Sequence, residues 1–480
     1  MAMEVELEPM AASIGVTVPV LRFLLCFAAT VPLSFLWRIV PGLLPKHLYS
    51  TGIGVSLSYI FFGLSSNMHF LVLIMVGYSF LLLLRPRCGI LTFFLGFGYL
   101  IGCHVYYMSG DDTGEDSFIV HFFFSFLFLI LLVYDFLTVI EGHVYHVSDI
   151  EGGNSVVLLT YIYIWLWGLN GVDPEDHLLL LKEEEGLREA QRKYRLTKLP
   201  FLVEYIGYCL CCMTHFAGSV FEMKDNLDWT EGKGIWSKEA KRPSPLPYGA
   251  TIRALIQADF CMALYLYLVP YFPLSRFTEP IYQEWAFWKK FGYQYMSGFT
   301  ACWKSFYYHL WSWLVNSSPP KPRWDRAKNV DILGVEFAKS SVVIPTVWNI
   351  QVSTWLRRYV YERLVQSGKK PGFFQLLATQ TISAIWHGVY PGYIIFFVQS
   401  AWQQATAPSM ANAFVFLNFA YTLVVINYSS VGFLVLNLHE TLAAFGRVYY
   451  IGTILPILMI LLGKVIKPRR PVRSKAQKEQ

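Results

Sequence analysis

Long apolar stretches recur along this chain and constrain its fold more than any other feature. They occupy residues 16–40, 57–84, 90–108, 118–140, 200–220, 248–272, 285–314, 376–385, 410–436 and 447–462. Hydrophobic residues make up 55% of the chain and charged residues only 15%, whereas soluble domains carry about 25% charged residues. A helix needs about 20 apolar residues to cross a bilayer. We therefore predict an all-α, polytopic membrane protein with about 9–11 spanning or re-entrant helices.

Local polarity adds detail to this pattern. The polar residues 65–67 interrupt the stretch 57–84, so we expect that helix to break there. Residues 223–247 are polar and are expected to form a long loop at the membrane interface. No repeat or linker divides residues 1–463, which we predict to form one membrane domain.

The last residues, 464–480, form a basic tail. Its only acidic residue is Glu479, and its basic residues are Lys464, Lys467, Arg469, Arg470, Arg473, Lys475 and Lys478. By the positive-inside rule the tail is cytoplasmic, where it can contact anionic lipid headgroups. No aromatic residues alternate with these bases, so we expect no nucleic-acid partner.

Three polar groups have simpler explanations than a metal or catalytic site. The possible metal ligands are Glu141, His143, His146 and Asp149 in one group, and Cys209, Cys211, Cys212 and His215 in another. We interpret the first group as a wet loop, because a metal site needs a defined ligand set and second shell that nothing else here indicates. We interpret the second as small residues at a packing seam, because it has no standard zinc spacing. The acidic run 183–185 opens an amphipathic stretch and is typical of a solvated helix face. We therefore predict no metal site.

Two polar residues between 347 and 393 are the candidate catalytic pair. Asn349 and His387 each lie in an apolar segment, and a short cationic turn at 368–371 separates the segments. Polar side chains at membrane depth are costly and are functional candidates for that reason. A histidine can accept a proton near neutral pH, and an asparagine amide can orient it or stabilise an oxyanion. The alternative for both residues is a structural hydrogen bond between helices.

Several sequence blocks resemble one enzyme family. They read WNIQVSTWLRRYVYERL at 348–364, SAIWHGVYPGY at 383–393, FLGFGYLIGCHVYYM at 94–108, EYIGYCLCCMTHFAG at 204–218 and KPRWDRAKNVDILGVE at 321–336. These blocks are similar to the membrane-bound O-acyltransferase family, and within it to the plant lysophospholipid acyltransferases.

The resemblance implies a fold and an activity. The family fold is a multi-helix bundle around a substrate tunnel, which admits acyl-CoA from the cytosol and the acceptor from the membrane. The implied catalytic pair maps onto His387 and Asn349. The expected reaction is direct acyl transfer from acyl-CoA to a lysophospholipid such as lysophosphatidylcholine or lysophosphatidylethanolamine, with His387 as general base. No tightly bound cofactor is expected, and the implied location is the endoplasmic reticulum membrane, in several passes.

Some stretches depart from the family pattern. Residues 115–181 are atypical, and the stretches 305–316 and 399–410 are shortened. Cys302 and Ser219 stand where relatives tend to have Arg and Pro. A second hypothesis is therefore a catalytically impaired isoform or a non-enzymatic lipid-binding membrane protein. A third is an enzyme of this family that acts on a sterol, diacylglycerol or protein.

Overall fold

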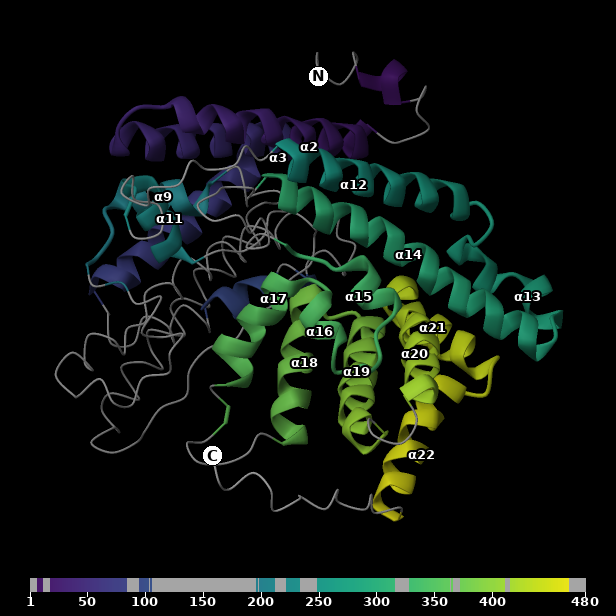
Figure 1. Cartoon of the computed structure of the whole chain (residues 1–480). Helices are drawn as coiled ribbons and strands as arrows, with labels where there is room; N and C mark the ends of the chain where they lie inside the picture. Colours follow the sequence, from purple (N-terminus) through teal and green to yellow (C-terminus); the bar gives the residue numbers. More distant parts are fainter. Residues whose placement is uncertain are drawn as a thin grey trace.

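A computed structural model gives the arrangement of the chain (Figure 1). It describes residues 7–11, 18–83, 95–102, 104–105, 196, 198–211, 222–233, 248–315, 328–362, 364–365, 372–410 and 415–465. Over these ranges the chain forms helices joined by turns and contains no strand, which confirms the all-α prediction. The atypical stretch 115–181, the polar group 141–149, the acidic run 183–185, Cys212, His215, Ser219 and the tail beyond Val465 lie outside the described residues.

The first long helices are α2 (Val18–Leu36) and α3 (Leu43–Leu83), with the short 3-10 turn η1 (Trp37–Ile39) between them. Helix α2 and the first part of α3 form a layer at one side of the molecule, and the second part of α3 runs beside α9 and α11 (Figure 1). The predicted break in α3 exists, but our placement at residues 65–67 is wrong: the non-helical residue is Gly63, with φ 81°. Glycine adopts this conformation without a steric penalty from a Cβ atom. The polar Asn67 donates an Nδ2 hydrogen to the Gly63 carbonyl, with 2.7 Å between nitrogen and oxygen. Asn67 therefore gives a hydrogen-bond partner to the carbonyl at the break and does not cause the break.

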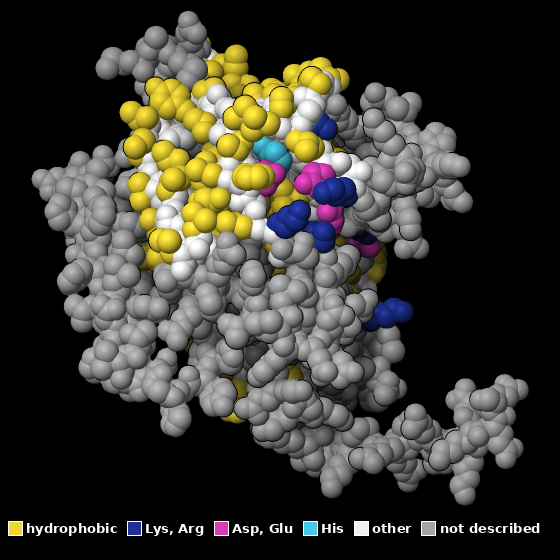
Figure 2. All heavy atoms as spheres, turned by 90° about the vertical axis from the view of Figure 1, so that its left-hand side faces the viewer, with side chains coloured by type: hydrophobic (Ala, Val, Ile, Leu, Met, Phe, Trp, Pro, Cys, Tyr) yellow, Lys and Arg dark blue, Asp and Glu magenta, His cyan; other side chains and the backbone are white. Residues whose placement is uncertain are grey.

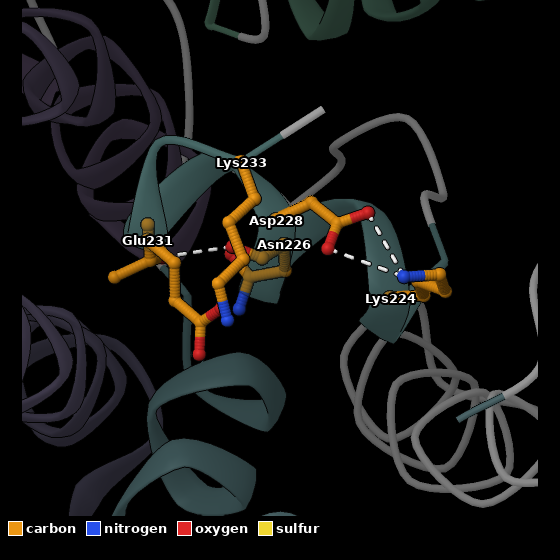
Figure 3. Close-up of polar contacts among 6 residues, drawn as sticks. Lys224, Asn226, Asp228, Glu231 and Lys233 are labelled. Atoms are coloured by element: carbon orange, nitrogen blue, oxygen red, sulfur yellow. Dashed lines mark hydrogen bonds and ion pairs between the residues drawn. The ribbon is translucent and has the colours of Figure 1, made fainter. Parts of the chain in front are cut away.

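The polar segment after residue 222 is partly helical, which corrects the prediction of a loop over 223–247. The helix α11 (Met223–Glu231) follows α9 (Leu202–Cys209) and ends at Gly232, whose φ of 67° is typical of a helix C-cap. The ion pair between Lys224 and Asp228, at 3.1 Å, joins side chains one turn apart (Figure 3). Lys233 also pairs with Glu231 just beyond the helix end (Figure 3). Local charge pairing thus supports a helix where polarity alone predicted a loop.

Two long helices cross the middle of the chain. They are α12 (Tyr248–Leu268) and α14 (Phe287–Val315), with η5 (Leu274–Thr278) and α13 (Pro280–Glu284) between them. They pack against each other, as Figure 1 shows. Both lie where the apolar pattern predicts helices, since the expected stretches were 248–272 and 285–314.

The C-terminal half carries the candidate pair. Its helices are α15 (Ile332–Glu336), α16 (Ile344–Val347), α17 (Ile350–Trp355), the π-helix η6 (Leu356–Tyr361), α18 (Phe373–His387), α19 (Pro391–Met410), α20 (Val415–Val435), α21 (Leu438–Gly446) and α22 (Ile451–Val465). The helices α18, α19 and α20 stand side by side in chain order, and each packs on the next (Figure 1). Helix α14 also packs on α20, and this joins the two halves of the described chain.

One described helix, over Asn418–Val435, is long and apolar enough to cross a membrane. A second candidate is the pair Leu438–Gly446 and Ile451–Leu458, which bends by 73°. Helix α12 exposes Ile252, Ile256 and Phe260, which are 55%, 63% and 61% exposed and lie four residues apart on one face. Figure 2 shows another face, near α9 and α11, where apolar side chains cover most of the described surface and charged ones gather at one edge. Such broad apolar surfaces indicate contact with lipid.

Four of the five described cysteines in the apolar stretches are buried packing residues. Cys209 belongs to the apolar cluster of α3, α9 and η6. Cys26, Cys211 and Cys261 belong to a second cluster, between α2, α12 and α14. All four are at most 4% exposed. This agrees with their interpretation as small apolar fillers.

Close contact between α14 and α20 yields a first prediction. A Cβ atom added to Gly298 would lie 2.2 Å from the carbonyl oxygen of Asn427, whereas one added to Gly292 meets nothing within 4 Å. We expect Gly298→Ala to destabilise the protein by about 1–3 kcal/mol, as overpacking typically does. Gly292→Ala, on the same helix, should be neutral or slightly stabilising because alanine favours helix. Thermal unfolding in detergent compares the two variants, and equal melting temperatures would contradict this packing.

Candidate active site

His387 lies at the turn between α18 and α19. It is the last residue of α18, and Gly388 follows with φ 144°, a value that L side chains rarely adopt. The Gly388 N–H donates to the Ala384 carbonyl at 2.9 Å and closes the last turn of the helix. Pro391 then begins α19. The chain turns sharply between α18 and α19. The imidazole therefore lies at the end of α18, next to a glycine that has no side chain.

Four aromatic rings from three helices surround the imidazole. Trp386 is adjacent in α18, with ring centroids 4.5 Å apart. Phe397 of α19 stacks on the imidazole at 5.2 Å, and Phe433 of α20 meets it edge-on at 5.1 Å. Tyr393 completes the group at 5.8 Å. These contacts restrict ring rotation, and the side chain stays partly exposed. The His387 imidazole is therefore held in one orientation while part of its surface stays accessible.

Asn349 has an unusual backbone conformation. Its φ of 44° and ψ of 54° are left-handed, and it occupies the N-cap position of α17. Asparagine tolerates this region better than other residues with a side chain, at a cost of about 1–3 kcal/mol. An N-cap asparagine usually accepts a hydrogen bond from its own helix, but the Asn349 side chain makes no such bond. Its amide is therefore available for another partner.

Helix α14 reaches the segment around Asn349 through His309. Asn329 Nδ2 lies 3.0 Å from His309 Nδ1, and Asn329 also bonds to the two residues after Asn349. The His309 ring meets Trp348, the residue before Asn349, edge-on, with ring centroids 5.8 Å apart. Among the described residues no hydrogen bond joins Asn349 directly to His387. Sequence reasoning did not single out His309 or Asn329, although an ionisable residue inside the aromatic stretch 285–314 was a usable signal for His309.

A buried ion pair fixes the π-helix that follows α17. Arg358 Nη1 lies 3.0 Å from Glu222 Oε1, and the Tyr359 hydroxyl donates to Glu222 Oε2 at 3.0 Å. The Glu222 side chain is 5% exposed. Because η6 also packs on α18, this pair links the segment before α11 to both candidate-bearing helices. Glu222 lies next to α11, a helix too short and polar to span a bilayer. Burial raises the pKa of its carboxyl to about 7, against the opposing effects of Arg358 and Tyr359.

This pKa predicts a pH-dependent stability. Between pH 4.5 and about 7 the folded chain holds a proton on Glu222 that the unfolded chain has released. The free energy of unfolding therefore falls as pH rises through this window, by at most about 1.4 kcal/mol per pH unit. We expect Glu222→Gln to remove this contribution, so that its melting temperature in detergent falls less between about pH 5 and pH 8. Glu440→Gln, at an exposed position of α21, is the matched control. Parallel pH curves for the Glu222→Gln protein and the parent would refute the prediction.

The stretches that depart from the family pattern are helical where they are described. Residues 305–315 continue α14, and residues 399–410 continue α19. Cys302 lies on α14, with its Sγ 4.0 Å from Asn427 Oδ1 of α20. Within the described residues, no three His, Cys, Asp or Glu side chains are grouped as metal ligands would be.

Comparison with protein families matches residues 90–439 to the membrane-bound O-acyltransferase family. This match covers both Asn349 and His387 and more than half of the chain. The chain therefore belongs to the membrane-bound O-acyltransferase family and is a membrane-located O-acyltransferase.

Individual relatives sharpen the comparison. Lysophospholipid acyltransferase 1 of Arabidopsis thaliana is 56% identical, over 99% of this chain and 100% of its own length. Lysophospholipid acyltransferase 2 of the same plant is 55% identical, over 99% of each chain. The human membrane-bound glycerophospholipid O-acyltransferase 2 is 24% identical, over 97% of this chain and 88% of its own. The first alignment spans 504 positions against the 480 residues of this chain, so at least 24 positions have no counterpart here.

Proposed function

We propose that the chain is an acyl-CoA-dependent lysophospholipid acyltransferase. The observation that carries this proposal is the full-length identity of 56% to a lysophospholipid acyltransferase. The fixed imidazole of His387 and the uncapped amide of Asn349 supply the chemistry that such a transfer needs.

In the proposed reaction the free hydroxyl of the lysophospholipid attacks the thioester carbonyl of acyl-CoA. His387 takes the hydroxyl proton as the oxygen–carbon bond forms. Asn349 donates its amide N–H to the developing oxyanion or orients the acyl group. The carbon–sulfur bond then breaks, and the proton passes from His387 to the CoA thiolate. No side chain forms a bond to the acyl group, so no covalent intermediate is proposed.

The proposed setting is the endoplasmic reticulum membrane, which residues 1–463 cross several times around a substrate tunnel. One support is the match to a family of membrane-bound enzymes. A second is the exposed apolar face of α12, where Ile252, Ile256 and Phe260 would contact lipid.

Substitution of the catalytic pair tests the proposal. We expect His387→Ala to lower turnover by about 10²–10⁴-fold, because one proton-transfer group typically contributes that much. The assay follows transfer of labelled oleoyl from oleoyl-CoA to lysophosphatidylcholine, in microsomes of yeast that lack their own enzyme. His439→Ala, at an exposed position of α21, should leave turnover unchanged. Retained transfer in the His387→Ala protein would refute the assignment, and a panel with sterol, diacylglycerol and peptide acceptors decides the acceptor class.

Asn349 needs a variant that keeps its backbone conformation. Glycine adopts positive φ without strain, so Asn349→Gly removes the amide but preserves the start of α17. We expect this variant to accumulate normally and to lose about 10²–10³-fold in kcat, as enzymes lose when an oxyanion donor is removed. Parental kcat in the Asn349→Gly protein would exclude a role for the amide.

A further inference from the structure

The residues just before α15 hold the segment around Asn349. The Asp331 N–H donates to the Val347 carbonyl at 2.8 Å, two residues before Asn349. The Ile350 N–H donates to the Asn329 carbonyl at 2.9 Å, immediately after Asn349. These two bonds fix the peptide groups on either side of the left-handed residue.

Asn329 also performs a task that normally falls to the N-cap residue. The first N–H groups of any helix lack partners within it, and the N-cap side chain usually accepts one of them. In α17 these groups include those of Ile350 and Gln351. The Asn329 carbonyl accepts from Ile350, and Asn329 Oδ1 accepts from the Gln351 N–H at 3.1 Å. Both donors are thus satisfied by a residue from outside the helix.

The Asn329 side chain is buried and has hydrogen-bond partners at both ends of its amide. It is 5% exposed, and its Nδ2 lies 3.0 Å from His309 Nδ1 on α14. Its oxygen and its nitrogen therefore both have partners, and these partners fix which way the amide points. Gln351 Nε2 adds a bond to the Lys328 carbonyl at 3.4 Å.

We propose that Asn329 is a positioning residue that caps α17 in place of Asn349 and so frees the Asn349 amide for the reaction. This inference rests on the role given to Asn349 in the proposed function. Without the Asn329 oxygen, the Gln351 N–H loses this hydrogen bond, and the residue at the N-cap position of α17 is Asn349. Asn349 then turns toward its own helix and away from the substrate.

The experiment compares Asn329 with a matched cap elsewhere. Asn437 Oδ1 accepts from the Glu440 N–H at 3.2 Å and caps α21. We expect Asn329→Ala to lower kcat by about 10²-fold, the loss typical when an oxyanion donor is displaced, and to change KM little. Asn437→Ala should leave kcat unchanged. Asn329→Asp keeps an acceptor oxygen for Gln351 and should restore most of kcat. If the Asn329→Ala protein does not accumulate, Asn329→Ser weakens the same bond and must give a graded loss of kcat.

A double variant separates positioning from stability. If Asn329 acts through Asn349, adding Asn329→Ala to Asn349→Gly should lower kcat no further. Further loss in the double variant, or equal kcat for the Asn329→Ala and Asn437→Ala proteins, would overturn the inference. Full turnover by the His387→Ala protein in the same preparations would instead refute the proposed function, so the two failures are distinguishable.

Discussion

Hydrogen bonding of buried polar groups governs this structure, because an apolar interior offers no water to an unpaired donor or acceptor. The partners often come from distant parts of the chain. Gln294 of α14 donates to the Tyr282 hydroxyl at 3.0 Å and to the Ala444 carbonyl at 2.6 Å, and so ties three helices together. Glu222 and Asn329 follow the same rule near the candidate site. These polar residues therefore join helices that are distant in the sequence.

The helix formed by α17 and η6 is fixed at both ends in this way. Asn329 holds its start, and Glu222 holds its end through Arg358 and Tyr359. The left-handed residue at 349 costs about 1–3 kcal/mol, whereas each hydrogen bond contributes about 0.5–1.5 kcal/mol net. Three bonds to residues 347, 350 and 351 are of a size to offset that cost. A strained asparagine at this position is therefore tolerated without help from its own side chain.

Sequence periodicity predicted the helical class and the long apolar helices α12, α14 and α20 to within a few residues. Asn349 and His387 were singled out as candidates because polar groups are rare in such segments, and their role stays a prediction. The sequence pattern placed the break in α3 wrongly, since polarity drew attention to residues 65–67 and conformational freedom lies at Gly63. The Glu222–Arg358 pair joins residues 136 apart, and the cap from Asn329 crosses 22 residues. No local pattern encodes such pairings, which depend on how the helices pack.

The π-helix η6 also sets the spacing between the two points that hold this helix. Its wider turn, closed by the Glu362 N–H to the Arg357 carbonyl at 2.8 Å, holds one residue more than an α-helical turn. The neighbouring arginines face different partners: Arg357 pairs with Glu362 at the surface, and Arg358 points inward to Glu222. A regular α-helical turn would hold one residue fewer, so the π-turn takes up an extra residue within the helix that runs from Asn349 to Tyr361. The spacing between the cap at Asn329 and the anchor at Glu222 thus depends on this one wider turn, because each end of the helix is held by a separate, distant partner.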